Sequence, residues 1–225
     1  MNEKVKYIVG IDEVGRGPIA GPITFCAFIM KGDTDILKVF DERILKDSKK
    51  LSDIKRREIR TKLNKLKLSG EVDFVIISTS AKIIDCIGLS KVIKKSIESC
   101  LSKLLRLNYN LDKSNTKIYL DGGLKIDKEY IIKIKKKYNY ELEYETVIKG
   151  DEKIESIACA SIMAKITRDN YMIYSANKLY DKDGKFYDWK NNVGYGTPKH
   201  YEYLKLHGAT DLHRQSFLNN YLAGK

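Results

Sequence analysis

The most constraining feature of this sequence is an apolar segment that runs directly into two acidic residues and a glycine-rich turn. The stretch reads Ile8-Val9-Gly10-Ile11-Asp12-Glu13-Val14-Gly15-Arg16-Gly17-Pro18. Its β-branched residues are typical of a strand, so we expect Asp12 and Glu13 where that strand ends. Carboxylates followed by a flexible, cationic loop suit a site that holds a metal ion and then a phosphate. If Gly-Arg-Gly-Pro did not follow the acidic pair, an ordinary polar turn would be the preferred interpretation.

The charge of the chain favours a polyanionic partner. Its 225 residues contain 42 Lys and Arg against 30 Asp and Glu, which gives a formal net charge of +12. An excess of this size points to nucleic acid, although a proteome that is generally rich in lysine would produce the same excess. The length predicts one large domain, or one domain with a helical appendage.

Cysteine spacing and hydropathy predict a cytoplasmic protein. The four cysteines are far apart and form no Cys-x-x-Cys pair, and Cys26 and Cys100 lie in apolar patterns that are typical of small buried hydrophobes. The first residues lack the apolar core of a signal peptide. No apolar run reaches the roughly 18 residues that a membrane span requires, so no membrane association is expected.

Apolar periodicity along the chain predicts an alternation of strands and helices. Strands are expected at residues 7–11, 23–30, 73–79, 117–120 and 142–148, the first two as a hairpin. Helices are expected from an N-cap at Ser52 to a stop at Ser69-Gly70, at 89–105, 130–137 and 156–174, and from Thr197 to His207. The small residues of 156–174 favour close packing of that helix on the sheet, and 181–192 is expected to be a loop.

Three separate segments place acids at or just after the end of an apolar strand. These acids are Asp12-Glu13, Asp121 and Asp151, and in one sheet such ends can converge. Carboxylates gathered in this way repel one another, and Mg²⁺ or Mn²⁺, which prefer hard oxygen ligands, remove the repulsion. Two such ions about 4 Å apart can activate water and stabilise the leaving oxygen in phosphodiester hydrolysis. Taken singly, Asp121 also fits a turn before glycine, and Asp151 a helix cap.

Asp169 is the acid that we do not assign to this group. A helix rises about 1.5 Å per residue, so Asp169 is expected roughly 20 Å beyond Ser156 and out of reach of Asp151. Lys165, one turn earlier, is a suitable ion-pair partner. We therefore interpret Asp169 as structural.

An ordered series of motifs resembles the ribonuclease HII family across residues 8 to 217. The opening motif is residues 10–18, continued by Ile19-Ala20-Gly21-Pro22. The others are Asp47-Ser48-Lys49-Lys50-Leu51-Ser52, Asp121-Gly122, Lys149-Gly150-Asp151, residues 156–165 with Arg168-Asp169, Gly194-Tyr195-Gly196-Thr197 and His213-Arg214-Gln215-Ser216-Phe217.

The resemblance implies an α/β, RNase H-like fold with a central mixed β-sheet flanked by helices and a C-terminal helical substrate-binding part. We expect a catalytic domain over 1–178 and a helical and loop extension over 179–225, packed on it as a single compact unit. The implied activity is endonucleolytic cleavage of RNA in RNA–DNA hybrids, with nicking 5′ of single ribonucleotides in duplex DNA. The implied catalytic and metal-binding residues are Asp12, Glu13, Asp121 and Asp151, with two Mg²⁺ or Mn²⁺ ions.

The resemblance also implies substrate-binding residues. Gly15-Arg16-Gly17 would contact the ribonucleotide 2′-OH through backbone amides that glycine brings close, and Tyr195 would pack at the following sugar. Lys49 and Lys50 are expected to contact phosphates, although a solvated lysine pair would look the same.

The sequence departs from the family pattern at two positions and leaves other functions open. Val193 stands where the family often has lysine, so no phosphate contact is assigned there, and Gly123 follows Asp121-Gly122 where other side chains are usual. For His213 and Arg214, bracing of the C-terminal segment is as good an interpretation as a functional role. His213 is not our choice of general base. A non-catalytic hybrid-binding protein and a DNA-junction nuclease of the same fold are the alternative functions. A monomer is expected, and a sliding clamp stays open as a partner, although residues 221–225 show no clear motif for one.

Overall fold

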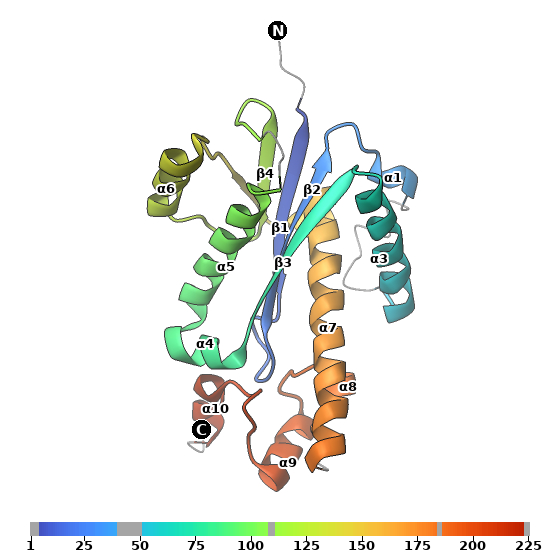
Figure 1. The fold of residues 1–225 in the computed structure, drawn as a ribbon. Coiled ribbons are helices and arrows are strands. Elements are labelled where there is room, and N and C mark those ends of the chain that lie inside the picture. The colour runs from blue at the N-terminus through green and yellow to red at the C-terminus, as the bar shows by residue number, and fades with distance from the viewer. Residues whose placement is uncertain (1–4, 40–50, 108–110, 184–185, 223–225) are drawn as a thin grey trace. The chain divides into compact units, whose positions relative to one another are not determined.

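The central element of the computed structural model, which describes residues 5–39, 51–107, 111–183 and 186–222, is a mixed β-sheet flanked by helices (Figure 1). In the described part of the chain it has five strands in the order β3-β2-β1-β4-β5. They are β1 (Tyr7–Val14), β2 (Ile23–Lys31), β3 (Val72–Thr79), β4 (Thr116–Asp121) and β5 (Glu145–Val147). The connection between β1 and β2 is too short for a parallel crossover, so these neighbours form the predicted hairpin. The predicted α/β class is confirmed.

Helices occupy most of the remaining described chain, and two predicted N-caps are confirmed. The Ser52 side chain accepts a hydrogen bond from the Lys55 amide, and the Thr197 side chain accepts one from the His200 amide. None of the helices in the described ranges is long and apolar enough to cross a membrane. They are α1 (Ile36–Val39), α3 (Asp53–Leu68), α4 (Ala81–Ile87), α5 (Leu89–Leu104), α6 (Lys128–Tyr138), the 3-10 turn η2 (Gly150–Glu152), α7 (Glu155–Asp183), α8 (Trp189–Asn192), α9 (Pro198–His207) and α10 (Gln215–Leu222).

Several element boundaries differ from the predicted ones. The fifth strand is shorter than predicted and stops at Val147. Helix α7 continues beyond Tyr174 to Asp183 because the intervening residues include neither glycine nor proline. The predicted loop over 181–192 is therefore wrong in part, since α7 fills its start and α8 fills its end. Helix α10 begins where Asp85 of α4 accepts hydrogen bonds from the amides of Gln215 and Ser216.

Internal contacts divide the chain into two compact units. This division differs from the domain boundary expected after residue 178, and that boundary stays a prediction. The first unit is Met1–Glu13, Phe25–Ile77 and Ile93–Ile166, and the second unit is Val14–Thr24, Ser78–Val92 and Thr167–Lys225.

The first unit packs the start of α7 directly on the backbone of β1. A Cβ added at Gly10 would lie 2.2 Å from the Ser156 carbonyl carbon and 2.3 Å from the Ile157 nitrogen. Glycine is therefore required at this position by close approach of two backbones. Beyond it, β2 is buried from Ile23 to Met30, which is typical of a strand covered on both faces. Cys26 and Cys100 are buried free thiols, as predicted.

The second unit has its own apolar cluster. Its buried members come from residues that follow β1, from α7 and from the C-terminal helices. They are Ile19, Ala20, Met172, Tyr187, Trp189, Leu204 and Leu218.

Substitution of Gly10 by alanine tests the close packing of α7 on β1. Because the new methyl group would overlap backbone atoms rather than a movable side chain, we expect the free energy of unfolding to fall by about 3 kcal/mol, measured by urea denaturation followed by circular dichroism. Gly123→Ala is the control, because its Cβ would meet nothing within 4 Å and should change stability by less than about 0.5 kcal/mol. Equal stability of the two variants would contradict the packing described above.

Candidate active site

Parallel pairing of β1 with β4 brings the first acids to one edge of the sheet. The pairing runs in register from Tyr7 opposite Thr116 to Ile11 opposite Leu120. Asp12 and Asp121 each follow the last of these paired residues, so both lie at the carboxyl ends of adjacent strands. Ligand and catalytic groups of open α/β sheets are commonly found at this edge. The structure therefore brings Asp12, Glu13 and Asp121 together as the sequence predicted.

Asp12 lies in an electrostatic environment that opposes its negative charge. The pKa of the Asp12 carboxyl is raised from 3.8 to about 8. Burial is the largest cause, and the nearby charges of Glu13 and Asp121 contribute to the same shift. A hydrogen bond from Ser161 and one from the Glu13 amide, 2.7 Å from Asp12 Oδ1, act in the opposite direction. Ser161 was not predicted as part of the site, because a serine within a helix of small residues gives no sequence signal. Burial, with repulsion from the two neighbouring acids in addition, outweighs the two hydrogen bonds.

Asp151 is close to this group by a route that differs from the predicted one. It lies in η2 and not at the end of β5, because Lys149 takes a left-handed conformation (φ +54°) that turns the chain. The next amide, that of Gly150, donates to Asp121 Oδ1 over 2.7 Å. Asp151 is buried. It directly follows Gly150, whose amide bonds Asp121, and so lies near the other acids. Since α7 begins only at Glu155, Asp151 precedes that helix by more than a cap position.

The four acids suit a divalent cation in their chemistry. In the described residues, no three histidine, cysteine, aspartate or glutamate side chains lie close enough together to hold a metal ion. Their carboxylate oxygens are nevertheless the ligands that hard divalent cations prefer. A bound cation would also offset the repulsion from Glu13 and Asp121, which together with burial raises the pKa of Asp12. Asp12, Glu13, Asp121 and Asp151 are therefore the candidate ligands.

The glycine-rich loop after β1 is held in the second unit by the buried side chain of Arg214. Each guanidinium nitrogen donates to a different backbone carbonyl: Nη2 to Gly15 (2.6 Å), Nη1 to Arg16 (2.9 Å) and Nε to Gly21 (3.0 Å). The pKa of Arg214 is lowered to about 10, first by burial and then by the positive charge of Arg168. Arg214 remains a cation at neutral pH, and it fixes the path of residues 15–21.

A second buried arginine, Arg168, joins this loop to the segment that carries Tyr195. It donates to the carbonyl oxygens of Pro22 (2.9 Å), Ala20 (3.1 Å) and Val193 (2.9 Å). Gly15 has φ +95°, and a Cβ there would lie 2.4 Å from Arg168 Nε. Sequence motifs contained both arginines but could not assign them this role, because their acceptors are backbone carbonyls. Burial lowers the pKa of Arg168, and the charge of Asp169, the buried acid interpreted as structural, partly opposes that shift.

Tyr195 is exposed and lies beside the loop. Its ring lies 3.9 Å from the position that a Cβ on Gly17 would take, and the Arg168 guanidinium lies 5.9 Å from the ring centroid. The preceding Gly194 has φ +87° and approaches Ala20 so closely that a Cβ would lie 2.4 Å from its carbonyl oxygen. The structure thus brings Gly17 and Tyr195 together.

Two buried histidines fix the backbone at Tyr195. His200 Nδ1 is 2.8 Å from the Tyr195 carbonyl oxygen, so it carries the proton and donates. His200 Nε2 then accepts from Trp189 Nε1 (3.0 Å) and from His213 Nε2 (3.1 Å). His213 Nδ1 accepts from the Thr210 amide (2.9 Å), which agrees with this tautomer. Burial lowers the pKa of His213 to about 3, so this ring is neutral and has a bracing role.

The remaining predicted residues add little to the site. Lys49 and Lys50 lie outside the described residues. Arg16 is exposed. Val193 has φ +41°, a conformation that is rare for a β-branched residue, and its carbonyl accepts from Arg168 as described above. Gly123 has open space around its Cβ position, so the departure from the family pattern there leaves Asp121 untouched.

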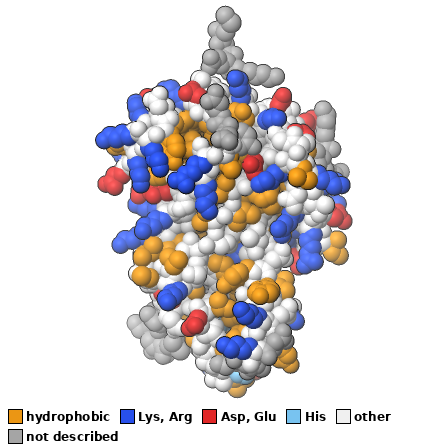
Figure 2. All heavy atoms as spheres, in the orientation of Figure 1, with side chains coloured by type: hydrophobic (Ala, Val, Ile, Leu, Met, Phe, Trp, Pro, Cys, Tyr) orange, Lys and Arg blue, Asp and Glu red, His pale blue; other side chains and the backbone are white. Residues whose placement is uncertain are grey.

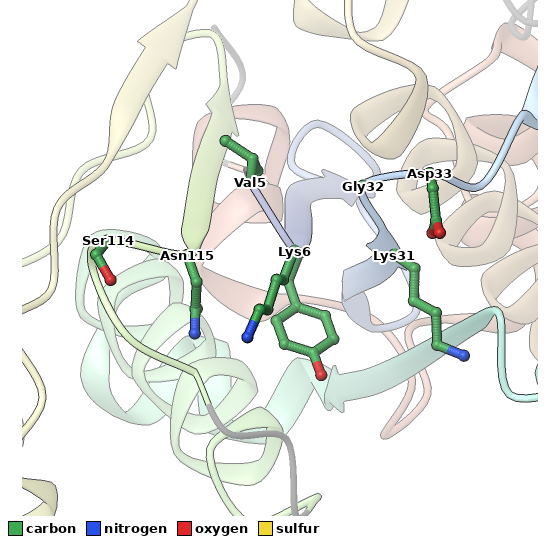
Figure 3. A pocket seen from close by; sticks show the side chains of 8 residues that line it. Val5, Lys6, Lys31, Gly32, Asp33, Ser114 and Asn115 are labelled. Carbon is green, nitrogen blue, oxygen red and sulfur yellow. The ribbon is translucent and has the colours of Figure 1, made fainter. Parts of the chain in front are cut away.

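A separate cavity of about 520 Å³ lies at the amino ends of β1 and β4, at the edge opposite the acids (Figure 3). Figure 3 shows the Lys6 and Asn115 side chains among those that line it. None of the candidate residues lines it. The residues that do are Val5, Lys6, Tyr7, Lys31, Gly32, Asp33, Ser114 and Asn115.

The mixed sheet, with acids at the ends of adjacent parallel strands, defines a metal-dependent nuclease of the RNase H-like class. The family model described as "Ribonuclease HII" matches residues 9–220. Ribonuclease HII of Clostridium beijerinckii is 40% identical over 218 residues, which cover 96% of this chain and 69% of that protein. The chain belongs to the ribonuclease HII family. It is accordingly a metal-dependent endoribonuclease, a hydrolase of the ribonuclease H type.

Solved structures confirm the RNase H-like fold. Ribonuclease H2 from Pyrococcus horikoshii superposes with a TM-score of 0.64 at 25% identity and covers 93% of each chain. Bst-RNase HIII, solved in complex with Mn²⁺, gives a TM-score of 0.65 at 19% identity over 96% of this chain and 68% of its own. The second likeness concerns the fold alone.

The raised pKa of Asp12 predicts how stability without metal depends on pH. Between 3.8 and about 8, the folded chain holds a proton on Asp12 that the unfolded chain has released, so stability falls as pH rises through this window. In EDTA, we expect the Tm to decrease from pH 5 to pH 8, and Asp12→Asn to remove much of that decrease. Mg²⁺ should raise the Tm more at pH 8 than at pH 5. A Mg²⁺ effect that is independent of pH would contradict this electrostatic account.

Proposed function

We propose that this protein nicks duplex DNA on the 5′ side of single embedded ribonucleotides and also cuts the RNA strand of RNA–DNA hybrids. The products are expected to carry 3′-hydroxyl and 5′-phosphate ends. The observation that carries the proposal is the buried Asp12 carboxyl, which Glu13 and Asp121 at the ends of β1 and β4 repel. The recognition loop follows Glu13 by only two residues in the chain, and family membership supports the choice of substrate class.

In this proposal the four acids hold the metal and orient the scissile phosphate. Asp12, Glu13, Asp121 and Asp151 bind Mg²⁺ or Mn²⁺, with two ions expected. When bound, such ions lower the pKa of a water molecule and offset negative charge on the phosphate. Asp121 keeps its orientation through the Gly150 amide, and Asp12 through the Glu13 amide and Ser161.

Recognition of the ribonucleotide is assigned to Gly15, Arg16, Gly17 and Tyr195. Backbone amides of the loop would bond the 2′-OH, which is the group that distinguishes RNA from DNA. The exposed part of the Tyr195 ring would pack on the next sugar. Lysine and arginine side chains outnumber acids on the face shown in Figure 2 and are spread over it, which supports sequence-independent attraction to phosphates. Lys49 and Lys50 belong to this set as a prediction.

The cellular role that follows is removal of ribonucleotides from DNA, in the cytoplasm, in repair and replication. The described cysteines are all free thiols, which agrees with a reducing compartment. A monomer is proposed. A sliding-clamp partner stays open, although residues 221–225 carry no clear motif for one.

Asp121→Asn tests the catalytic assignment. The change removes a charge and keeps the side-chain size, so we expect cleavage to fall by more than about 10³-fold, while binding of the same duplex changes little. The assay uses a DNA duplex with one embedded ribonucleotide and is run with Mg²⁺ and with Mn²⁺. Asp127→Asn is the control: this exposed acid pairs with Lys94, and the variant should cut normally.

The same assay separates the alternative functions. Binding without cutting in either metal would favour a non-catalytic hybrid-binding protein. Equal cutting of an all-DNA duplex would favour a DNA-junction nuclease, because such an enzyme has no 2′-OH to recognise. Either result would overturn the proposal.

Gly17→Ala and Gly15→Ala separate recognition from folding. A Cβ on Gly17 would meet only the Tyr195 ring at 3.9 Å, so we expect a Tm within about 2 °C of the parent but cleavage of the embedded ribonucleotide reduced by at least about tenfold. Gly15→Ala should instead lower the Tm markedly, because its Cβ would collide with Arg168. Thermal denaturation and the nicking assay measure both. Normal nicking by Gly17→Ala would contradict the role given to the loop.

A further inference from the structure

The orientation of two amides in the recognition loop follows from the bonds that Arg214 makes. A trans peptide unit is planar, and its C=O and N–H point in opposite directions. The Gly15 carbonyl shares a peptide unit with the Arg16 amide, and the Arg16 carbonyl shares one with the Gly17 amide. There are no cis peptide bonds in the described chain. Because both carbonyls point to the buried Arg214 guanidinium, both amide N–H groups point away from it.

The direction away from Arg214 is the exposed side of the loop. Gly15 and Arg214 are buried, whereas Arg16 and Gly17 are exposed. Consecutive amides that point to one side form a concave site for an anion or a hydroxyl oxygen. Apart from its chain neighbours, a Cβ on Gly17 would find only Tyr195 within 4 Å, so the space beside Gly17 is open on that side.

Only an arginine has the geometry for this arrangement. Its three nitrogens bond three separate carbonyls, those of Gly15, Arg16 and Gly21, and the planar guanidinium fixes their directions relative to one another. A lysine ammonium keeps the charge but offers one nitrogen, which cannot reach three carbonyls spread over a planar fork. Charge and geometry can therefore be separated by a single substitution.

We propose that Arg214 is a specificity-determining positioning residue, which turns the Arg16 and Gly17 amides outward as a pair to receive the ribonucleotide 2′-OH. It acts through the backbone and does not touch substrate. The inference rests on the proposed function, since it assumes that this loop recognises the ribose hydroxyl. It goes further by naming the buried group that creates the recognition surface.

The test compares Arg214→Lys with its parent in a chain that already carries Asp121→Asn, so that substrate is bound but not cut. Fluorescence anisotropy measures Kd for two matched duplexes, one with a single ribonucleotide and one all DNA. We expect Arg214→Lys to reduce the preference for the ribonucleotide duplex by about tenfold, equivalent to the loss of about one neutral hydrogen bond between a loop amide and the 2′-OH. Affinity for the all-DNA duplex should stay within about twofold, because the charge is kept.

The control is Arg106→Lys, made in the same background. Arg106 is exposed, lies beyond the end of α5 and bonds Tyr138, far in sequence from the loop. This variant should leave the preference unchanged.

Each other outcome has a defined meaning. An unchanged preference in Arg214→Lys, or an equal loss of affinity for both duplexes, would overturn the role of Arg214 and leave the proposed function standing. Absence of any preference in the Asp121→Asn parent would instead overturn the recognition role of the loop itself.

A measurement on the unsubstituted arginine covers the case in which Arg214→Lys does not fold. NMR of the ¹⁵N-labelled Asp121→Asn protein bound to the ribonucleotide duplex reports the Arg214 guanidinium protons. We expect slow exchange with water and couplings across the bonds to the Gly15 and Arg16 carbonyls. Rapid exchange and absent couplings in that complex would overturn the inference.

Discussion

The parallel pairing of β1 with β4 is the constraint on which the candidate catalytic site depends. It brings Asp12 and Asp121 to the same edge of the sheet, where burial of Asp12, with repulsion from Glu13 and Asp121 in addition, raises its pKa to about 8. Gly10 allows this arrangement, because the start of α7 could not approach β1 past a side chain. The packing that requires glycine at position 10 therefore also positions the acids of the candidate site.

Sequence reasoning succeeded where a residue type reports its own environment. The apolar runs located the strands to within a few residues, except β5, and Ser52 and Thr197 identified helix starts because capping is a local interaction. The acids at the strand ends were also recognisable. Asp151 was assigned to the right neighbourhood on the wrong element, because a left-handed Lys149 has no signature in the sequence.

Long-range polar contacts were beyond sequence reasoning for a physical reason. Arg168 and Arg214 bond backbone carbonyls, and every residue has one, so no partner can be identified by type. The start of α10 is similar: its amides bond Asp85, which lies 130 residues earlier. The sequence indicated His213 only as a brace of the C-terminal segment and did not single out His200, because only geometry defines the tautomers that hold the Tyr195 carbonyl.

The burial of Arg168 and Arg214 has a consequence for ionic strength. The acceptors of their described hydrogen bonds are neutral carbonyl oxygens, which do not cancel the positive charge of either arginine. Asp169 acts on Arg168, and Asp85 on Arg214, as nearby negative charges. Mobile ions screen exposed lysines well but buried charges poorly. As salt rises, general attraction to DNA therefore weakens first, while the field at the loop persists. The part of the binding free energy that distinguishes a ribonucleotide from plain DNA should therefore change less with salt than the part that both duplexes share.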